Sequence, residues 1–256
     1  MRLSTVNATS IYRMSTNTND WFTSWFNTPY YHILYKDRGH DEAQAFMNAL
    51  TQYIHLPEEG HILDLACGRG RHSLYLNSIG FEVTGVDLSE ESIAYAKQFE
   101  NDRLHFEVHD MCLPYGKQFD AVFNLFTSFG YFEHEEDNLK TIKAIKSNLK
   151  PDGIGVIDFL NVPHVLEHLV EANTKTIEGI TFHMTRSLED GYIVKNIKFE
   201  DQGNSFHFQE RVKAFTLDDF KAMFEQAGLT LLEVFGDYHL RPYHATQSER
   251  LIMTFM

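Results

Sequence analysis

Residues 61–87, HILDLACGRGRHSLYLNSIGFEVTGVD, contain the pattern that decides the fold of this chain. They read as an apolar strand ending in an acid, a turn of small residues, a helix, and a second apolar strand that also ends in an acid. The glycines Gly68 and Gly70 let a ligand approach the backbone of the turn closely. The helix from about Arg71 presents free N–H groups at the same place, and Asp87 can bind two adjacent ribose hydroxyls. These features predict a nucleoside-binding pocket.

Two residues of this stretch differ from those of a dinucleotide-binding fingerprint. That fingerprint has a third glycine, where this chain has Ser73, and it places a pyrophosphate on the helix N-terminus. Asp64, on the strand before the turn, would repel a pyrophosphate but suits a cationic amino group. An NAD-dependent dehydrogenase is therefore a competing interpretation that both residues disfavour.

The segment Asp64-Leu65-Ala66-Cys67-Gly68-Arg69-Gly70, with Asp87 at the end of the next strand, resembles the cofactor-binding motifs of class I S-adenosylmethionine (SAM)-dependent methyltransferases. The resemblance runs from about Trp21 to the C-terminus. It is closest to bacterial small-molecule enzymes with Thr-Ser-Phe-Gly-Tyr-Phe after the fourth strand, here residues 127–132. It implies in-line transfer of a methyl group from SAM to a small organic acceptor, S-adenosylhomocysteine as the product, and no metal.

Strands and helices alternate through the middle of the chain, which predicts parallel βαβ units. We expect strands near residues 62–66, 81–86, 104–108, 119–126 and 154–160, and helices near 71–78, 90–99 and 136–149. Two last strands, near 229–235 and 250–255, are too close together for a crossover helix and should pair antiparallel. The resemblance implies an α/β fold, a doubly wound Rossmann-like sheet of seven strands whose last strand is antiparallel.

Two further helices are predicted outside these units. One begins at Asp41 and carries apolar residues on one side, namely Ala45, Phe46, Ala49, Leu50 and Tyr53. The other has Thr216 as its N-cap with acids in the first turn, and Gly228 ends it.

Between Thr176 and Phe215 the pattern changes to period two, with turn signals at Asp190-Gly191 and Gln202-Gly203-Asn204. We expect three antiparallel strands inserted after the fifth strand. Their apolar residues suit either a lid over the substrate or a dimer interface: Phe182, Met184, Phe206 and Phe208. The expected organisation begins with a disordered tail (residues 1–20) and an aromatic and helical segment covering the SAM site (21–60). The SAM-binding core (61–160) and the β insertion (161–215) follow, and a C-terminal helix with the last two strands (216–256) ends the chain.

Composition limits the partners and the compartment. The 36 acids against 22 Lys and Arg give a formal net charge of −14, which argues against a nucleic-acid substrate because phosphates require a basic surface. Cys67 and Cys112 are the only cysteines, so a reduced, cytoplasmic setting fits better than a disulfide framework. No apolar run approaches the ~20 residues of a membrane span. The first 20 residues lack the apolar region of a signal peptide, and translation could begin at Met1 or Met14.

The resemblance assigns residues to each part of SAM. The methionine end is expected at Asp64 and the backbone of 66–70, the ribose at Asp87, and the adenine at Asp110 and Met111. Tyrosines of the N-terminal segment should fold over the sulfonium, because a π face attracts positive charge. The residues expected to bind the cofactor are Asp64, Ala66, Cys67, Gly68, Gly70, Arg71, Asp87, Leu88, Asp110, Met111, Asn124, Leu125, Phe126, Tyr30 and Tyr35.

The acceptor site is less determined by the sequence. Residues expected to contact the acceptor are Phe129, Tyr131, Arg241 and Tyr243, and the candidates for a general base are His134, Tyr131 and His239. The identity of the acceptor, its reacting atom and a choice between monomer and homodimer stay open. The alternative functions are a SAM-binding protein without catalysis, acting as a partner or sensor, and a methyltransferase for a protein or tRNA.

Overall fold

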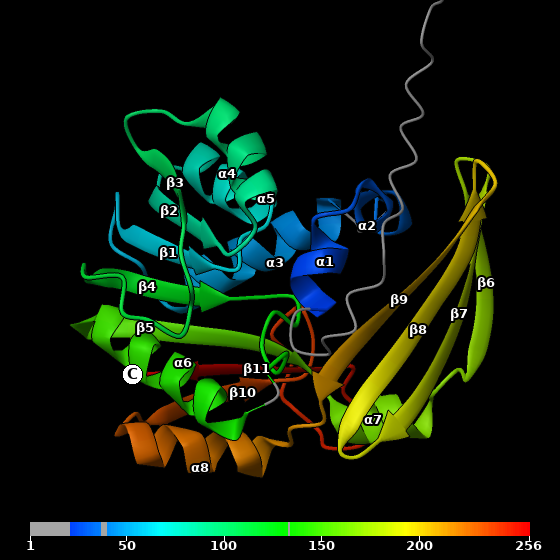
Figure 1. Cartoon of the computed structure of the whole chain (residues 1–256). Helices are drawn as coiled ribbons and strands as arrows, with labels where there is room; N and C mark the ends of the chain where they lie inside the picture. Colours follow the sequence, from blue (N-terminus) through cyan, green and yellow to red (C-terminus); the bar gives the residue numbers. More distant parts are fainter. Residues whose placement is uncertain (1–20, 37–39, 133) are drawn as a thin grey trace, which may run out of the picture.

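The computed structural model describes residues 21–36, 40–132 and 134–256 (Figure 1). Its main sheet has seven strands in the order β10-β11-β5-β4-β1-β2-β3. The strands are β1 (His61–Leu65), β2 (Glu82–Asp87), β3 (Leu104–Val108), β4 (Phe119–Asn124), β5 (Leu149–Leu160), β10 (Leu231–Phe235) and β11 (Arg250–Phe255). The strands from β5 to β3 pair in parallel, and β11 is antiparallel to both of its neighbours. The expected fold class, a doubly wound sheet with its last strand antiparallel, is confirmed.

Helices cover both faces of this sheet (Figure 1). They are α3 (His40–Tyr53), α4 (Arg71–Ser78), α5 (Glu90–Ala96) with the 3₁₀ turn η2 (Lys97–Phe99), α6 (Glu135–Asn148) and α8 (Leu217–Ala227). One buried cluster joins the sheet to α3, α4 and α5, and another joins its opposite face to α6 and α8. Because parallel strands buried on both faces have no polar side, their sequences are mainly apolar, and in β1 the residues after His61 are all buried, Asp64 included.

The helix ends follow the local signals in the sequence. Thr216 caps α8 and forms a reciprocal capping box with Asp219, and Gly228 closes the helix in the left-handed region. The apolar face of α3 is rotated from the expected one: Ala45 and Tyr53 are exposed. The residues that face the core are Ala43, Phe46, Met47 and Leu50. Both sets have helical spacing and share Phe46 and Leu50, so the spacing alone did not distinguish the two faces.

The insertion has four strands rather than the expected three. They are β6 (Ala172–Ile177), β7 (Ile180–Glu189), β8 (Tyr192–Asp201) and β9 (Asn204–Lys213), in a separate antiparallel sheet, and α7 (Val162–Glu167) leads from β5 into it. The expected turns at Asp190-Gly191 and Gln202-Gly203 are present, each with two positive φ values, as two-residue hairpins require. The sequence pattern missed β6 because this edge strand is almost wholly exposed and polar, so it has no alternation.

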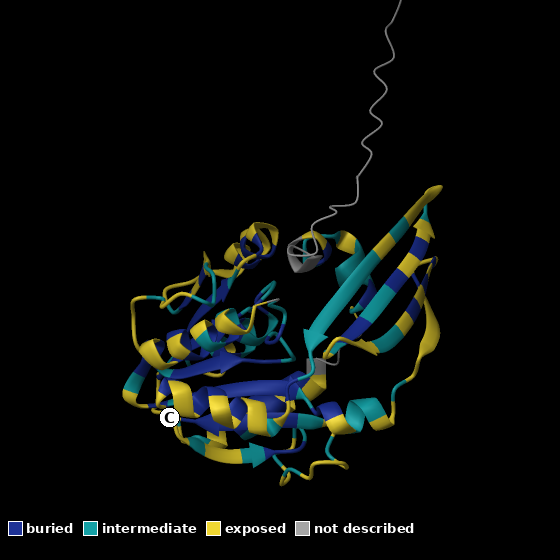
Figure 2. Cartoon of the chain, turned by 60° about the horizontal axis from the view of Figure 1, so that its bottom comes forward, coloured by how far each residue is buried: buried dark blue, intermediate teal, exposed yellow. Residues whose placement is uncertain are grey.

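The apolar face of the insertion is covered by the chain's own N-terminal helices, α1 (Trp21–Phe26) and α2 (Pro29–Leu34). Trp25 and Leu34 pack there against Phe182 and Met184. Buried and exposed residues alternate along these strands (Figure 2). The apolar residues of this face are thus packed within the chain.

The expected 21–60 segment therefore consists of two parts, because α1 and α2 pack on the insertion whereas α3 packs on the main sheet. The expected tail, residues 1–20, lies outside the described residues. Among the helices of the described ranges, none is both long and apolar enough to span a membrane.

Candidate functional site

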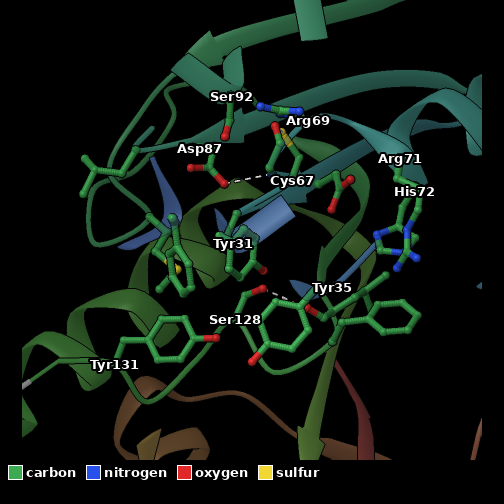
Figure 3. A pocket seen from close by; sticks show the side chains of 18 of the residues that line it. Tyr31, Tyr35, Cys67, Arg69, Arg71, His72, Asp87, Ser92, Ser128 and Tyr131 are labelled. Carbon is green, nitrogen blue, oxygen red and sulfur yellow. Dashed lines mark hydrogen bonds between the residues drawn. The ribbon is translucent and has the colours of Figure 1, made fainter. Parts of the chain in front are cut away.

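A cavity of about 350 Å³ lies at the carboxyl ends of the parallel strands. Its walls come from the β1–α4 turn, the ends of β2 and β3, the segment after β4, and α1–α2. Figure 3 shows Asp87, Arg69 and Ser92 on one side of it, with Tyr35, Ser128 and Tyr131 on the other. Ligands of open α/β sheets bind at this edge, so the cavity is the candidate binding site.

The two glycines of the β1–α4 turn have different roles. A Cβ built on Gly68 would meet nothing within 4 Å, so this glycine leaves the backbone open to the cavity that it lines. A Cβ on Gly70 would lie 2.6 Å from the ring of Phe106, and Gly70 does not line the cavity. The expectation that Gly70 contacts the cofactor is corrected: its missing side chain makes room for Phe106 at the start of α4.

Asp64 is the most deeply buried acid of the cavity wall, with 2% of its surface exposed. Ser73, the residue in place of a third glycine, donates a hydrogen bond from Oγ to Asp64 Oδ2 at 2.6 Å. Burial raises the pKa of Asp64 to about 7, with the Ser73 hydrogen bond opposing the rise and the charge of Asp87 adding to it. The site therefore holds a carboxyl group that a cationic ligand group would stabilise in its ionised form.

The ends of β2 and β3 supply two further acids. Asp87 accepts hydrogen bonds from the backbone N–H groups of Gly68 and Ser89, both at 2.8 Å, which fixes its carboxylate toward the cavity. Burial raises the pKa of Asp87 although these bonds oppose the shift. Asp110 is held by a bond from the N–H of Cys112 at 2.9 Å. All three acids at the strand ends thus face one cavity, and the expected residues Leu88 and Met111 line it beside them.

The turn after β4 is held in a strained conformation. Phe126 and Thr127 have φ values of 56° and 61°, which non-glycine residues seldom adopt. The carboxylate of Asp158, in β5, accepts a hydrogen bond from the backbone N–H of Phe126 at 2.8 Å. The backbone carbonyl oxygen of Asp158 accepts one from the N–H of Thr127 at 3.0 Å. Arg250 of β11 binds the Asp158 carboxylate at 2.7 Å and donates to Thr127 Oγ1 at 2.9 Å.

This buried pair was missed by the sequence analysis, although an acid inside the apolar run Ile154–Leu160 was a signal for it. Asp158 is fully buried, which raises its pKa while Arg250 opposes the rise. Leu125 and Phe126 reach the cavity, as expected. Asn124 does not: it is fully buried in β4, and its Nδ2 donates to Leu65 O at 3.3 Å. The expected contact between Asn124 and the cofactor stays a prediction for its backbone, since its side chain is bonded within the sheet.

Basic side chains line another part of the cavity. Arg71 Nη2 lies 2.9 Å from His72 Nε2, and the His72 ring stacks on Phe126 with centroids 4.4 Å apart. Arg69, which the sequence analysis did not assign, has a buried Nε without a hydrogen-bond partner in the described part of the chain. Burial lowers the pKa of His32 to about 4, and the charge of Arg69 adds to this effect.

The N-terminal helix α2 presents only some of its tyrosines to the cavity. Tyr31 and Tyr35 line it, since residues four apart share a helix face. Tyr30 lies on another face, where its hydroxyl donates to Asp201 Oδ2 at 2.9 Å and its ring packs on Phe199. The expectation that Tyr30 contacts the cofactor is corrected, and Tyr31 takes that place in the wall.

On the expected acceptor side, Tyr131 lines the cavity but Phe129 does not. Phe129 is fully buried against Phe215 and Phe220 in the core cluster under α8. Its expected contact with the acceptor is corrected, because the turn at Gly130, with φ 82°, separates the two neighbouring aromatic rings. Ser128 and Phe132 are cavity residues that accompany Tyr131.

Arg241 and Tyr243, in the loop between β10 and β11, were expected to contact the acceptor. In the structure neither residue lines the cavity. Arg241 is 75% exposed and pairs with Asp237, while Tyr243 donates from its hydroxyl to Asn161 Oδ1 at 3.0 Å. The expected bases His134 and His239 are exposed and lie outside the cavity. Its histidines are instead His32, His72 and His109. Tertiary packing decides these placements, and no local pattern distinguishes one histidine from another.

Comparison with known proteins identifies the family to which the chain belongs. A family model described as a methyltransferase domain matches residues 37–234. The chain is 31% identical over 211 residues to the Bacillus subtilis protein YqeM, named as a methyltransferase, and covers 83% of it with 77% of its own length. It is also 27% identical over 217 residues to a Streptomyces fradiae dTDP-3-amino-3,6-dideoxy-alpha-D-glucopyranose N,N-dimethyltransferase, across 78% of this chain and 82% of that protein.

Solved structures agree with the fold. A SAM-dependent methyltransferase from Clostridium acetobutylicum superposes with a TM-score of 0.74 at 20% identity, covering 88% of this chain and 95% of that one. At this identity the likeness supports the arrangement of the sheet and its helices.

Proposed function

The chain belongs to the SAM-dependent methyltransferase family and uses SAM as its cofactor, and on this premise we propose that it methylates the nitrogen of a small organic amine. The nitrogen is proposed because several similar proteins are named as N-methyltransferases. Besides the Streptomyces fradiae aminosugar enzyme, a glycine/sarcosine N-methyltransferase of Halorhodospira halochloris is 27% identical over 197 residues. A small acceptor is favoured by the volume of the cavity, since pockets for small ligands span about 300–1,000 Å³.

The residues of the cavity fit the chemical groups of SAM. Asp64, whose buried carboxyl has a raised pKa, would hold the α-ammonium group, and Arg71 would hold the α-carboxylate. Asp87 would accept the ribose hydroxyls, and Asp110 would accept the adenine amino group beside Met111. The open backbone at Gly68 leaves room for the ligand, as the absence of contacts to a built Cβ indicates.

When bound, SAM supplies an electrophilic methyl group and a leaving group that departs as a neutral thioether. The chain's own contribution is mainly positioning, because displacement at carbon requires the nucleophile in line with the breaking bond. Tyr31, Tyr35 and Phe126 place aromatic rings around the cavity, where π faces attract a positive charge and exclude water. Asp158 and Arg250 hold Phe126 in its strained turn and so keep this wall in place.

The observation that carries the proposal is the division of one cavity into two chemically different ends. The acids at the ends of β1, β2 and β3 form one end, and the hydroxyls of Tyr35, Ser128 and Tyr131 form the other (Figure 3). The first end complements a cationic nucleoside, whereas the second can bind the hydrogen-bonding groups of a small polar acceptor.

Two measurements test this function. Calorimetry should show SAM and S-adenosylhomocysteine binding well below about 1 mM, a limit that corresponds to ~4 kcal/mol, and NAD should not compete. Transfer of a labelled methyl group from SAM should then mark the amine-containing fraction of a metabolite extract. Label found in alcohols or thiols would contradict nitrogen as the methylated atom. Label found only in protein or RNA would contradict the proposal of a small-molecule acceptor.

A further inference from the structure

Two tyrosines of the N-terminal segment make the same type of bond to the insertion sheet. Tyr30 donates its hydroxyl proton to Asp201 at 2.9 Å, and Tyr35, the C-cap of α2, donates to the two carboxylate oxygens of Glu210 at 2.6 and 2.8 Å. Tyr30 lies outside the cavity, whereas Tyr35 lines it. The structure thus contains a matched pair of tyrosine–carboxylate bonds, of which one faces the proposed site of chemistry.

Glu210 belongs to a half-buried polar network behind the cavity wall. Its side chain is 17% exposed and lies 3.5 Å from the ammonium group of Lys195, which is 14% exposed. Trp25 donates its indole N–H to Glu210 at 2.8 Å. Lys195 also donates to the hydroxyl oxygen of Tyr35 and lies over its ring, 4.6 Å from the centroid. A carboxylate and an ammonium group therefore both contact the phenol from the side of the insertion.

Four other polar side chains of the cavity are poor proton acceptors, namely Tyr131, Ser128, His72 and His32. Tyr131 and Ser128 donate their hydroxyls to the backbone carbonyls of Thr127 and Leu125, which cannot take up a proton. The Nε2 atom of His72 is engaged by the Arg71 guanidinium, and His32, with a pKa of about 4, is a weak base near neutral pH. The hydroxyl of Tyr35 differs because its proton already points to a carboxylate.

We propose that Tyr35 is the catalytic residue that receives the proton of the acceptor, and that Glu210 and Lys195 are the positioning residues that let it do so. This proposal rests on the proposed function, methyl transfer to an amine. The acceptor nitrogen forms its bond to the methyl carbon while the carbon–sulfur bond breaks and its electron pair stays on sulfur. The N–H proton passes to the phenolic oxygen of Tyr35, whose own proton moves to Glu210 and from there to water. Lys195 stabilises negative charge on the phenol during the transfer.

The inference gives the insertion sheet a chemical role. Tyr35 comes from the N-terminal segment, while Glu210 and Lys195 come from β9 and β8, more than a hundred residues away in sequence. The acceptor end of the site is complete only when α2 and the insertion are in contact.

The test compares Tyr35→Phe and Glu210→Gln with the matched control Tyr30→Phe, which removes a hydroxyl from the same helix outside the cavity. Methyl transfer from labelled SAM is measured with glycine, sarcosine, D-glucosamine and the amine fraction of an extract. Tyr35→Phe and Glu210→Gln should lower kcat by about 100-fold or more, the usual contribution of general-base catalysis. The KM for the amine and the calorimetric affinity for S-adenosylhomocysteine should change little in any of the three variants.

A second readout does not depend on turnover. In protein labelled with ¹³C at tyrosine Cζ, the Tyr35 resonance is assigned by its absence from Tyr35→Phe. Without cofactor, this resonance should shift in Glu210→Gln and stay in place in Tyr30→Phe, since only the first change alters its hydrogen bond.

The outcomes separate the two proposals. Full transfer by Glu210→Gln, or an equal loss in Tyr30→Phe, would overturn the relay while leaving the methyltransferase function intact, because the hydroxyls would then only hold α2 on the sheet. A wild-type protein that binds S-adenosylhomocysteine but labels no amine would overturn the amine acceptor, and the relay with it. An unmoved Tyr35 resonance in Glu210→Gln would also contradict the relay.

Discussion

The two ends of the cavity are built in different ways. At the strand ends, Asp64 is bonded to Ser73 and Asp87 to Gly68, over separations of 9 and 19 residues. Behind the wall formed by α2, Glu210 of the insertion is bonded to Trp25 and Tyr35 over separations of 185 and 175 residues. The end proposed to bind the cofactor is thus made of local contacts along the βαβ units, whereas the end proposed to bind the acceptor is completed only when distant segments meet.

The two ends also differ in charge. The strand ends hold buried acids whose pKa values are raised by desolvation, so they favour a cationic ligand. Behind the opposite wall lies a paired carboxylate and ammonium group, Glu210 and Lys195. The acids of the first end complement a positive charge on the ligand. At the second end, the charges of Glu210 and Lys195 balance each other in the free protein. The comparison suggests that ligand affinity and proton handling are assigned to separate structural units.

The junction between the two ends should be the most sensitive place. Arg250→Met leaves the Asp158 carboxylate buried without its cation and removes support from the turn at Phe126 and Thr127. We expect a loss of about 3–5 kcal/mol in the free energy of unfolding, the usual cost of breaking a buried pair. The control is Arg241→Met, which breaks the exposed pair with Asp237 and should cost less than about 1 kcal/mol. Urea unfolding of both variants measures this, and equal losses would contradict the role of the junction.

A second prediction separates backbone strain from packing at the cofactor end. Gly68 and Gly70 both have positive φ, so an alanine at either position should cost about 1–2 kcal/mol. At Gly70 the new methyl group also meets Phe106 at 2.6 Å, which should add about 1–3 kcal/mol of overpacking. Thermal and urea unfolding should therefore show the larger loss in Gly70→Ala. A larger loss in Gly68→Ala would show that the space at the turn is not open.

A third prediction tests whether affinity belongs to the strand ends. Asp87→Asn should weaken SAM binding by about 10- to 100-fold, since a hydrogen bond to a charged group contributes about 1.5–3 kcal/mol. Glu210→Gln should leave SAM affinity nearly unchanged, because Glu210 lies outside the cavity wall. Calorimetric titration with SAM measures both. A comparable loss in both variants would remove the distinction between the two ends.

The smallest expected effect concerns pH. The pKa of Asp64 is raised from 3.8 to about 7 in the free protein, so this carboxyl reduces the stability of the fold progressively as the pH rises between these values. An ammonium group beside Asp64 favours the ionised form, so binding should release a proton. Below about pH 7, SAM affinity should then fall by up to about tenfold per pH unit, equivalent to about 1.4 kcal/mol.

Titrations in buffers of different ionisation enthalpy measure that proton release. In Asp64→Asn the pH dependence between 5 and 7 should disappear while the far-UV spectrum stays the same. A wild-type affinity that is constant over this range would place the ammonium group of SAM away from Asp64.

The sequence determined the main sheet and the acids at its strand ends. Apolar runs, capping residues and turn glycines act within a few residues, so Asp64, Asp87 and Asp110 could be placed at strand ends that topology brings together. The functions of these residues in binding stay predictions. The strand β6 escaped detection because an exposed polar edge strand has no periodic signal.

Only the tertiary structure decided which aromatic and basic side chains reach the cavity. Tyr30 and Tyr35 belong to the same short segment, yet the packing of this segment directs one to Asp201 and the other to the site. Phe129 is in the core, although it stands two residues before Tyr131 in the cavity wall. The physical reason is that these positions depend on contacts between segments far apart in the chain, which no local spacing encodes. Residues 61–87 therefore identify the methyl donor, and the packing of α2 on the insertion forms the wall where the acceptor is proposed to react.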